Sequence, residues 1–154
     1  MDQVIYASLI RQVRGLDLLR ELLGKEYRVL CERKMEVVAA FEFSIQELIR
    51  QLVNEKEFVM QRLRGQRLLE YAKTLEPDSA QALLDLVAAI DASEQKVSAQ
   101  ASLNSQLSLA LLDQNEKNLQ TLFKQAVPEK TMVYGRHGAM RQVAAQGALI
   151  SGRL

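Results

Sequence analysis

The sequence predicts an all-α protein, namely an elongated antiparallel helical bundle or coiled coil of about three helices with a flexible C-terminal tail. Three observations favour this fold. Apolar residues recur at helical spacing over residues 4–63, both prolines come late in the chain (Pro77 and Pro128), and aromatic residues make up only 5% of it. A core built mainly from Leu, Val, Ile and Ala is typical of helical bundles.

The length of 154 residues and a net charge of +1 indicate one ordinary core and give no global case for nucleic-acid binding. We expect a helical bundle domain at 1–127 and a basic, Gly-containing tail at 128–154 that orders on binding. Residues 77–123 carry six acids and two lysines, whereas residues 124–154 carry five bases and one acid. These two segments either attract each other or remain separate solvated surfaces.

The apolar stripe of residues 4–63 covers an arc of roughly 140°, and no proline interrupts it. Taken as one helix, this segment is on the order of 90 Å long and needs partner helices to bury its stripe. Cys31 lies in the stripe and is expected to be a buried small hydrophobe. Lys56 also points into it, to snorkel or to fix register. Phe43 and Phe58 project from the charged side, either as isolated exposed residues or as a second contact surface.

The periodicity changes phase after Gly65, which predicts a bend or a new helix through residues 68–75. A clear stop is expected before Pro77, with Asp78 or Ser79 as the next cap. A short helix over 79–90 and a long one over 93–126 follow; whether residues 79–126 form one helix or two stays open. A weak helix is expected at 139–149.

The helix over 93–126 carries leucines on most of its sides, and such a helix is expected to be covered on most of them. Asn104, Ser108 and Asn115 share a face with Val97 and Leu111. This arrangement fits either a three-helix core with polar positions that set register or a groove for a partner.

The sequence offers no chemistry for catalysis. Its single histidine, His137, and single cysteine, Cys31, are far apart, so we expect no metal, no cofactor and no enzyme activity. The scattered basic residues of the tail make a poor nucleic-acid footprint. No signal peptide or integral membrane segment is evident, which predicts a cytoplasmic protein.

Several segments together resemble a known family. They are the stripe LDLLRELLGKEYRVLCERK, the later LLDQNEKNLQTLF, the tail VYGRHG and the ending LISGRL. In these four segments the chain resembles the FlgN-type flagellar export chaperones. The resemblance implies a cytoplasmic chaperone that binds the terminal helical region of hook-associated (hook–filament junction) proteins. It would prevent their premature assembly and deliver them to the flagellar type III export apparatus.

By the same resemblance, client contact involves the last long helix and the tail. The substrate-protein-binding residues implied are Leu107, Leu111, Asn115, Asn118, Leu119, Leu122, Phe123 and Tyr134. The alternative reading is a non-enzymatic coiled-coil scaffold or adaptor that self-associates through Phe43, Phe58 or the leucines of 103–112, so a homo-oligomer stays open.

Overall fold

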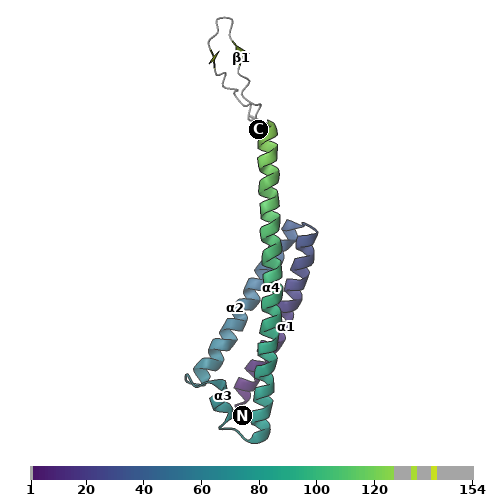
Figure 1. Ribbon diagram of the computed structural model, residues 1–154. Helices are drawn as coiled ribbons and strands as arrows, with labels where there is room; N and C mark the ends of the chain where they lie inside the picture. The colour runs from purple at the N-terminus through teal and green to yellow at the C-terminus, as the bar shows by residue number, and fades with distance from the viewer. Residues whose placement is uncertain (1, 127–132, 135–139, 142–154) are drawn as a thin grey trace, which may run out of the picture. The chain divides into compact units, whose positions relative to one another are not determined.

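The structure is a computed structural model that describes residues 2–126, 133–134 and 140–141. Its helices are α1 (Gln3–Cys31), α2 (Met35–Arg62), α3 (Leu68–Ala72) and α4 (Pro77–Ala126). Two short strands, β1 (Val133–Tyr134) and β2 (Met140–Arg141), pair antiparallel. Because the four helices contain most of the described residues, the predicted all-α bundle is confirmed (Figure 1).

The chain divides into two compact units, Met1–Ser108 and Leu109–Leu154. The domain limits predicted from the sequence, 1–127 and 128–154, stay a prediction. Most of the tail and of the weak helix predicted at 139–149 lies outside the described residues, although Met140–Arg141 form a strand rather than a helix.

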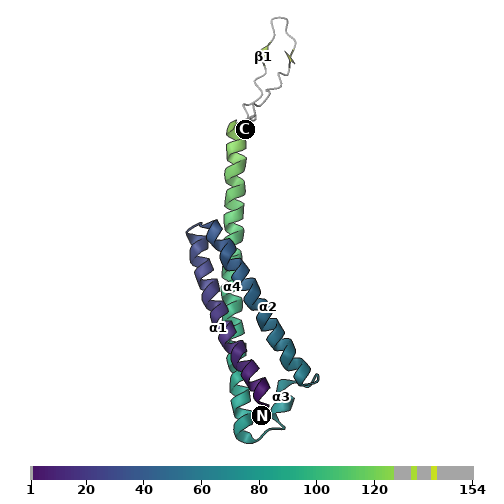
Figure 2. The ribbon, with the colours of Figure 1, turned by 180° about the vertical axis from the view of Figure 1, so that it is seen from behind.

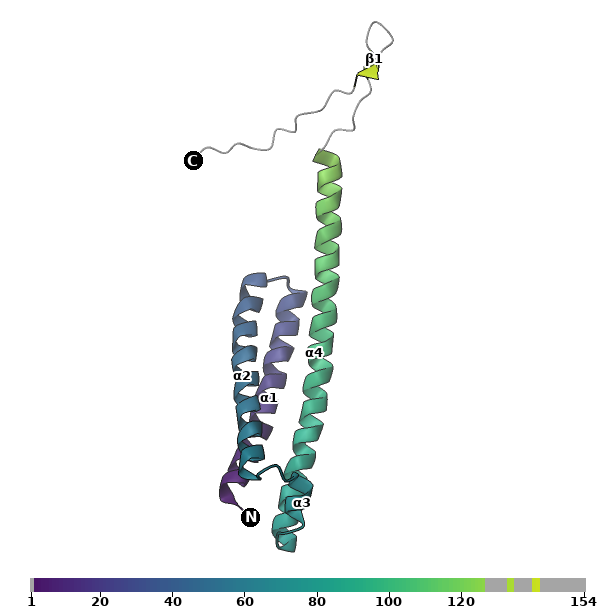
Figure 3. The same cartoon turned by 90° about the vertical axis from the view of Figure 1, so that its left-hand side faces the viewer.

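The single helix predicted for residues 4–63 is wrong, because α1 and α2 form an antiparallel hairpin (Figure 3). Arg33 takes a left-handed conformation with φ 59°, and the amides of Arg33 and Lys34 donate to the carbonyls of Leu30 and Val29. These two bonds form a Schellman ending. Folding back at 32–34 sets the two halves of the apolar stripe against each other, which a straight rod cannot do. Cys31 is exposed at this turn, so its predicted burial is also wrong.

The break predicted near Gly65 is confirmed. The amides of Arg64 and Gly65 donate to the carbonyls of Gln61 and Met60, and both residues have positive φ. After the short α3, α4 begins at Pro77, where a proline costs no helical hydrogen bond. Asp78 and Ser79 therefore lie inside its first turn rather than at its cap. Residues 79–126 belong to one helix.

The first unit has two apolar clusters. The larger joins all four helices through Ile5, Leu9, Leu16, Val59, Leu63, Ala72, Leu83 and Ile90. The smaller joins α1 to α2 through Leu19, Leu23 and Ile45, with Val97 and Ala101 of α4 packed against it. Leu52 packs on both clusters and fits closely against Gly15, where an added Cβ would lie 2.8 Å from Leu52 Cδ2.

Side chains also tie the start of α1 to its neighbours. Asp2 caps α1 by accepting from the amide of Val4, and its second oxygen accepts from Arg62 Nε at 2.9 Å. The Asp2 amide donates to the Tyr71 hydroxyl of α3 at 3.0 Å. Within the described part of the chain, no helix is long and apolar enough to cross a membrane.

Candidate functional site

The residues predicted for client binding lie on α4 and β1. Leu107 is half-buried and belongs to the first unit. In the second unit Leu111 is half-buried, and Asn115 and Asn118 are exposed. Tyr134 lies in β1, where it is paired with Met140 of β2. The structure therefore places seven of these eight residues on a single helix, and their role in binding stays a prediction.

The second unit's part of α4 has one apolar side whose side chains are mostly exposed. Wound at about 100° per residue, five of its six large apolar side chains fall within an arc of roughly 120°, and the sixth, Leu109, lies about 40° beyond it. We call this set the leucine face: Leu111, Leu112, Leu119, Leu122 and Phe123. Four of the five are 55–64% exposed. Isolated exposed leucines are ordinary, but a contiguous row of this kind is typical of interaction surfaces.

Leu112 is the member that the sequence-based site missed. In the helical projection Leu112 lies between Leu119 and Phe123, which were both predicted to bind the client, so its position in the sequence was enough to predict it as well. Asn115 lies inside the arc and Asn118 at its edge, so two exposed amides accompany the apolar side chains. Such a surface can bury apolar groups and also satisfy polar groups of a partner.

The opposite side of the same segment is polar and internally paired. Lys117 Nζ contacts Asp113 Oδ2 at 2.6 Å, and the Thr121 hydroxyl donates to the Lys117 carbonyl at 2.9 Å. Gln120 Nε2 donates to Glu116 Oε1 at 3.2 Å. Residues 109–125 thus form an amphipathic helix whose polar side is solvated.

Earlier in α4, the same side of the helix is buried within the first unit. Leu83, Ile90, Val97, Asn104 and Leu111 succeed each other at heptad spacing. The first two are buried, and Val97 packs against the core. The continuation of this stripe past residue 108 is what supplies the leucine face.

Asn104 is a polar residue within the core, as expected if the polar positions of α4 set the register of the helices. It is only 5% exposed, and its Nδ2 donates to the Leu23 carbonyl at 2.8 Å and to Glu26 Oε2 at 2.7 Å. Burial raises the pKa of the Glu26 carboxyl; the Asn104 bond opposes this, and the Glu42 side chain adds to it. Asn115, one of the other two polar positions, is exposed instead.

The electrostatics of the first unit are those of ion pairs between helix surfaces. Arg50 and Gln51 lower the pKa of Glu47 to about 2. Arg11, with help from Ser8, lowers the pKa of Glu55. No group of three or more His, Cys, Asp or Glu able to hold a metal occurs among the described residues.

Phe43 and Phe58, which the sequence placed on the charged side of the stripe, are both exposed on α2. Phe43 is 78% exposed and is the most exposed of the large hydrophobic residues in the described part of the chain.

The model of the FlgN family, described as FlgN protein, matches residues 1–142. None of the curated proteins and none of the solved structures matches the chain.

Proposed function

The chain belongs to the FlgN family of flagellar export chaperones, and we propose that its clients are the hook–filament junction proteins. It holds them by their terminal helical region in the cytoplasm, keeps them from assembling early, and delivers them to the flagellar type III export apparatus. The observation that carries this proposal is the leucine face, an uncovered apolar side on a helix of a chaperone family.

A client helix with its own apolar stripe would pair with the leucine face in the manner of one amphipathic helix laid against another. Fully burying a large apolar side chain is worth about 1.5–3 kcal/mol. Five such side chains compete with an association cost of about 4–15 kcal/mol. The balance gives moderate affinity, which suits a chaperone that must release its client at the export apparatus.

The experiment replaces Leu111, Leu119 and Leu122 by alanine. Alanine is the best helix former, so α4 is expected to persist. Binding of a purified hook–filament junction protein should weaken about 100-fold, corresponding to about 3 kcal/mol, because hot-spot truncations each cost about 1–2 kcal/mol. Isothermal titration calorimetry measures the affinity, and circular dichroism reports the helix content.

A matched control replaces Lys117, Gln120 and Thr121 by alanine on the opposite side of the same turns. This control should bind the client as the parent does. A client that lacks its terminal helix should bind neither the parent nor the control. If the leucine variant stays helical and retains full affinity, the proposed binding face is wrong.

Tyr134 is proposed as an anchor of the tail, since a tyrosine ring buries well while its hydroxyl stays hydrated. Tyr134→Ala should leave the melting temperature unchanged and reduce export of the client in cells. Unchanged export in this variant would remove Tyr134 from the proposed site.

A second candidate function, a self-associating scaffold, is favoured by the exposure of Phe43. Phe43→Ala should then dissolve an assembly that forms without any other protein. If the chain binds a junction protein in a defined ratio and Phe43→Ala changes nothing, the scaffold is excluded.

A further inference from the structure

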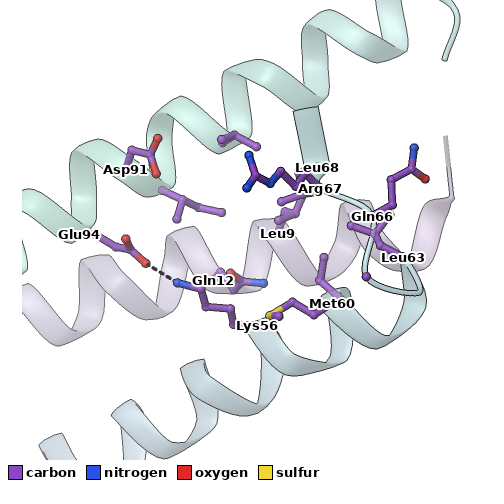
Figure 4. A pocket seen from close by; sticks show the side chains of 14 residues that line it. Leu9, Gln12, Lys56, Met60, Leu63, Gln66, Arg67, Leu68, Asp91 and Glu94 are labelled. Carbon is purple, nitrogen blue, oxygen red and sulfur yellow. Dashed lines mark ion pairs between the residues drawn. The ribbon is translucent and has the colours of Figure 1, made fainter. Parts of the chain in front are cut away.

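The first unit contains an open groove between α2 and α4, with α1 as its floor. Two neighbouring cavities of about 320 and 220 Å³ form it, and both are lined by Gln12, Lys56 and Glu94. The floor is apolar and comes from α1: Leu9 in the larger cavity, and Leu16 and Leu19 in the smaller. Figure 4 shows the larger cavity, with the Lys56 and Glu94 side chains directed toward each other. Figure 2 shows α2 and α4 from behind the view of Figure 1.

One wall of the groove is a regular ridge on α2. It consists of residues 49, 53, 56 and 60, which follow each other at spacings of four, three and four and therefore share one side of the helix. Three of them, Ile49, Val53 and Met60, are exposed apolar residues that line the cavities. The remaining one is Lys56. We call these four residues the α2 ridge.

Among the described residues, the charge on this ridge has a weak partner in Glu94. Lys56 Nζ lies 3.7 Å from Glu94 Oε1, and about half or more of each side chain is exposed. Exposed pairs of this kind contribute about 0–1 kcal/mol, so the pair presents little barrier to an incoming helix. The groove accordingly offers three apolar side chains and one readily available positive charge.

The second unit of the chain contains the complementary pattern. Residues 112, 116, 119 and 123 have the same spacing of four, three and four. Leu112, Leu119 and Phe123 are exposed members of the leucine face, and the remaining residue is Glu116. Gln120 Nε2 donates to the carboxylate of Glu116 in a long hydrogen bond of 3.2 Å.

In an antiparallel alignment the two patterns match at every position. The three apolar pairs are Ile49 with Phe123, Val53 with Leu119, and Met60 with Leu112. In the same alignment Lys56 lies opposite Glu116. We propose that the α2–α4 groove binds residues 112–123 of a second copy of this chain, in this antiparallel register. The apolar pairs supply the affinity, and the Lys56–Glu116 pair selects the register, because a shifted alignment places a charge against an apolar residue.

The occupant must come from another molecule. Residues 87–94, which line the groove, and residues 112–123 both belong to α4, and one continuous helix cannot lie beside itself. Because α4 runs opposite to α2, the bound segment runs in the same direction as α4 of the copy that binds it, so the two copies associate head-to-tail through a single contact. The contact covers the leucine face of the copy that supplies residues 112–123, so self-association and client binding compete for the same side chains.

The test uses the full chain without any client, so its outcome is independent of the proposed function. Sedimentation equilibrium measures the dimer dissociation constant of the parent and of K56E, E116K and the double variant K56E/E116K. Each single variant should weaken the dimer at least about tenfold, because like charges then face each other. The double variant, in which the two charges are exchanged across the contact, should restore dimerisation to near the parent value.

K117E serves as the matched control, since it reverses a charge one residue away on the polar side of α4. It should dimerise as the parent does. A parent chain that stays monomeric at all concentrations overturns the proposal, and so do single variants that dimerise normally or a double variant that shows no rescue. Lys56 and Glu116 are both exposed, so folding of the variants, checked by circular dichroism, is expected to be unaffected.

A second measurement fixes the register. In a Cys31→Ser background, Met60→Cys and Leu112→Cys are introduced in separate proteins, which are mixed under mild oxidation. The register predicts a disulfide between the two proteins, whereas Asp113→Cys, one residue away on the polar side of α4, should cross-link far more slowly. Equal cross-linking of both would contradict the antiparallel alignment.

Discussion

A single buried carboxyl group illustrates how polar residues specify this bundle. Glu26 of α1 is 4% exposed, and its oxygen accepts from Asn104 Nδ2 of α4. A buried polar contact in an apolar seam fixes the register of two helices, because any shift leaves both groups without a partner. Burial raises the pKa of Glu26 above its ordinary value of 4.5, and the neighbouring Glu42 raises it further.

The raised pKa gives stability a definite pH dependence. The folded chain holds the Glu26 proton more tightly than the unfolded chain, so this contribution is complete below pH 4.5 and is lost as pH rises through the folded-state pKa. Glu26→Gln stays neutral and keeps an oxygen for Asn104. The variant should therefore gain stability over the parent as pH rises from 4 to 7, measured by urea unfolding at each pH.

Glu21→Gln is the control of opposite sign. Lys25 lowers the pKa of Glu21, so this residue stabilises the fold above its ordinary pKa and loses that effect as pH falls. The Glu21 variant should match the parent at low pH and be slightly less stable near neutrality. A Glu26→Gln variant whose stability difference from the parent does not change with pH would show that Glu26 is not buried as described.

At the scale of helices, the two turns were not equally visible in the sequence. Gly65 marks the end of α2 in the sequence, and the break was predicted correctly from the change of phase in the apolar periodicity after it. The turn at 32–34 uses the same hydrogen-bond pattern but places Arg33 in the left-handed conformation, where glycine or asparagine is usual. No local signal marks it, since the stripe continues in phase on both sides. Its cause is the burial of one half of the stripe against the other.

The two helical glycines of α1 provide a matched pair of predictions. Nothing lies within 4 Å of a Cβ added at Gly24, so Gly24→Ala should stabilise the chain by about 0.5–1 kcal/mol through helix propensity. At Gly15 the added Cβ would lie 2.8 Å from Leu52 Cδ2, and Leu52 packs on both apolar clusters. Gly15→Ala should therefore gain less or lose stability. Thermal unfolding of both variants measures the difference, and equal gains would contradict the close approach of α2 at Gly15.

At the scale of the whole chain, periodicity was a better guide to the candidate surface than to the connectivity. The leucines of α4 exceeded what one neighbouring helix could cover, and that excess is the leucine face. Sequence alone could not tell buried from exposed positions, because Asn104 and Asn115 occupy similar places in the pattern and only the first lies against α1. The α2–α4 groove was also hidden, since it depends on how three helices are spaced.

The two units should differ in how readily their helix opens. Residues 83–104 of α4 are anchored by Leu83, Ile90 and Asn104, so their amides exchange only when the first unit opens. Residues 109–126 have no such burial, and a helical stretch this short is marginal by itself in water. Hydrogen exchange followed by mass spectrometry should show at least about 100-fold slower exchange in 83–104. The measurement is made on K56E, in which self-association is weakened, and a junction protein added to it should slow exchange at 109–126. Uniform protection along α4 without any partner would mean that the leucine face is already covered.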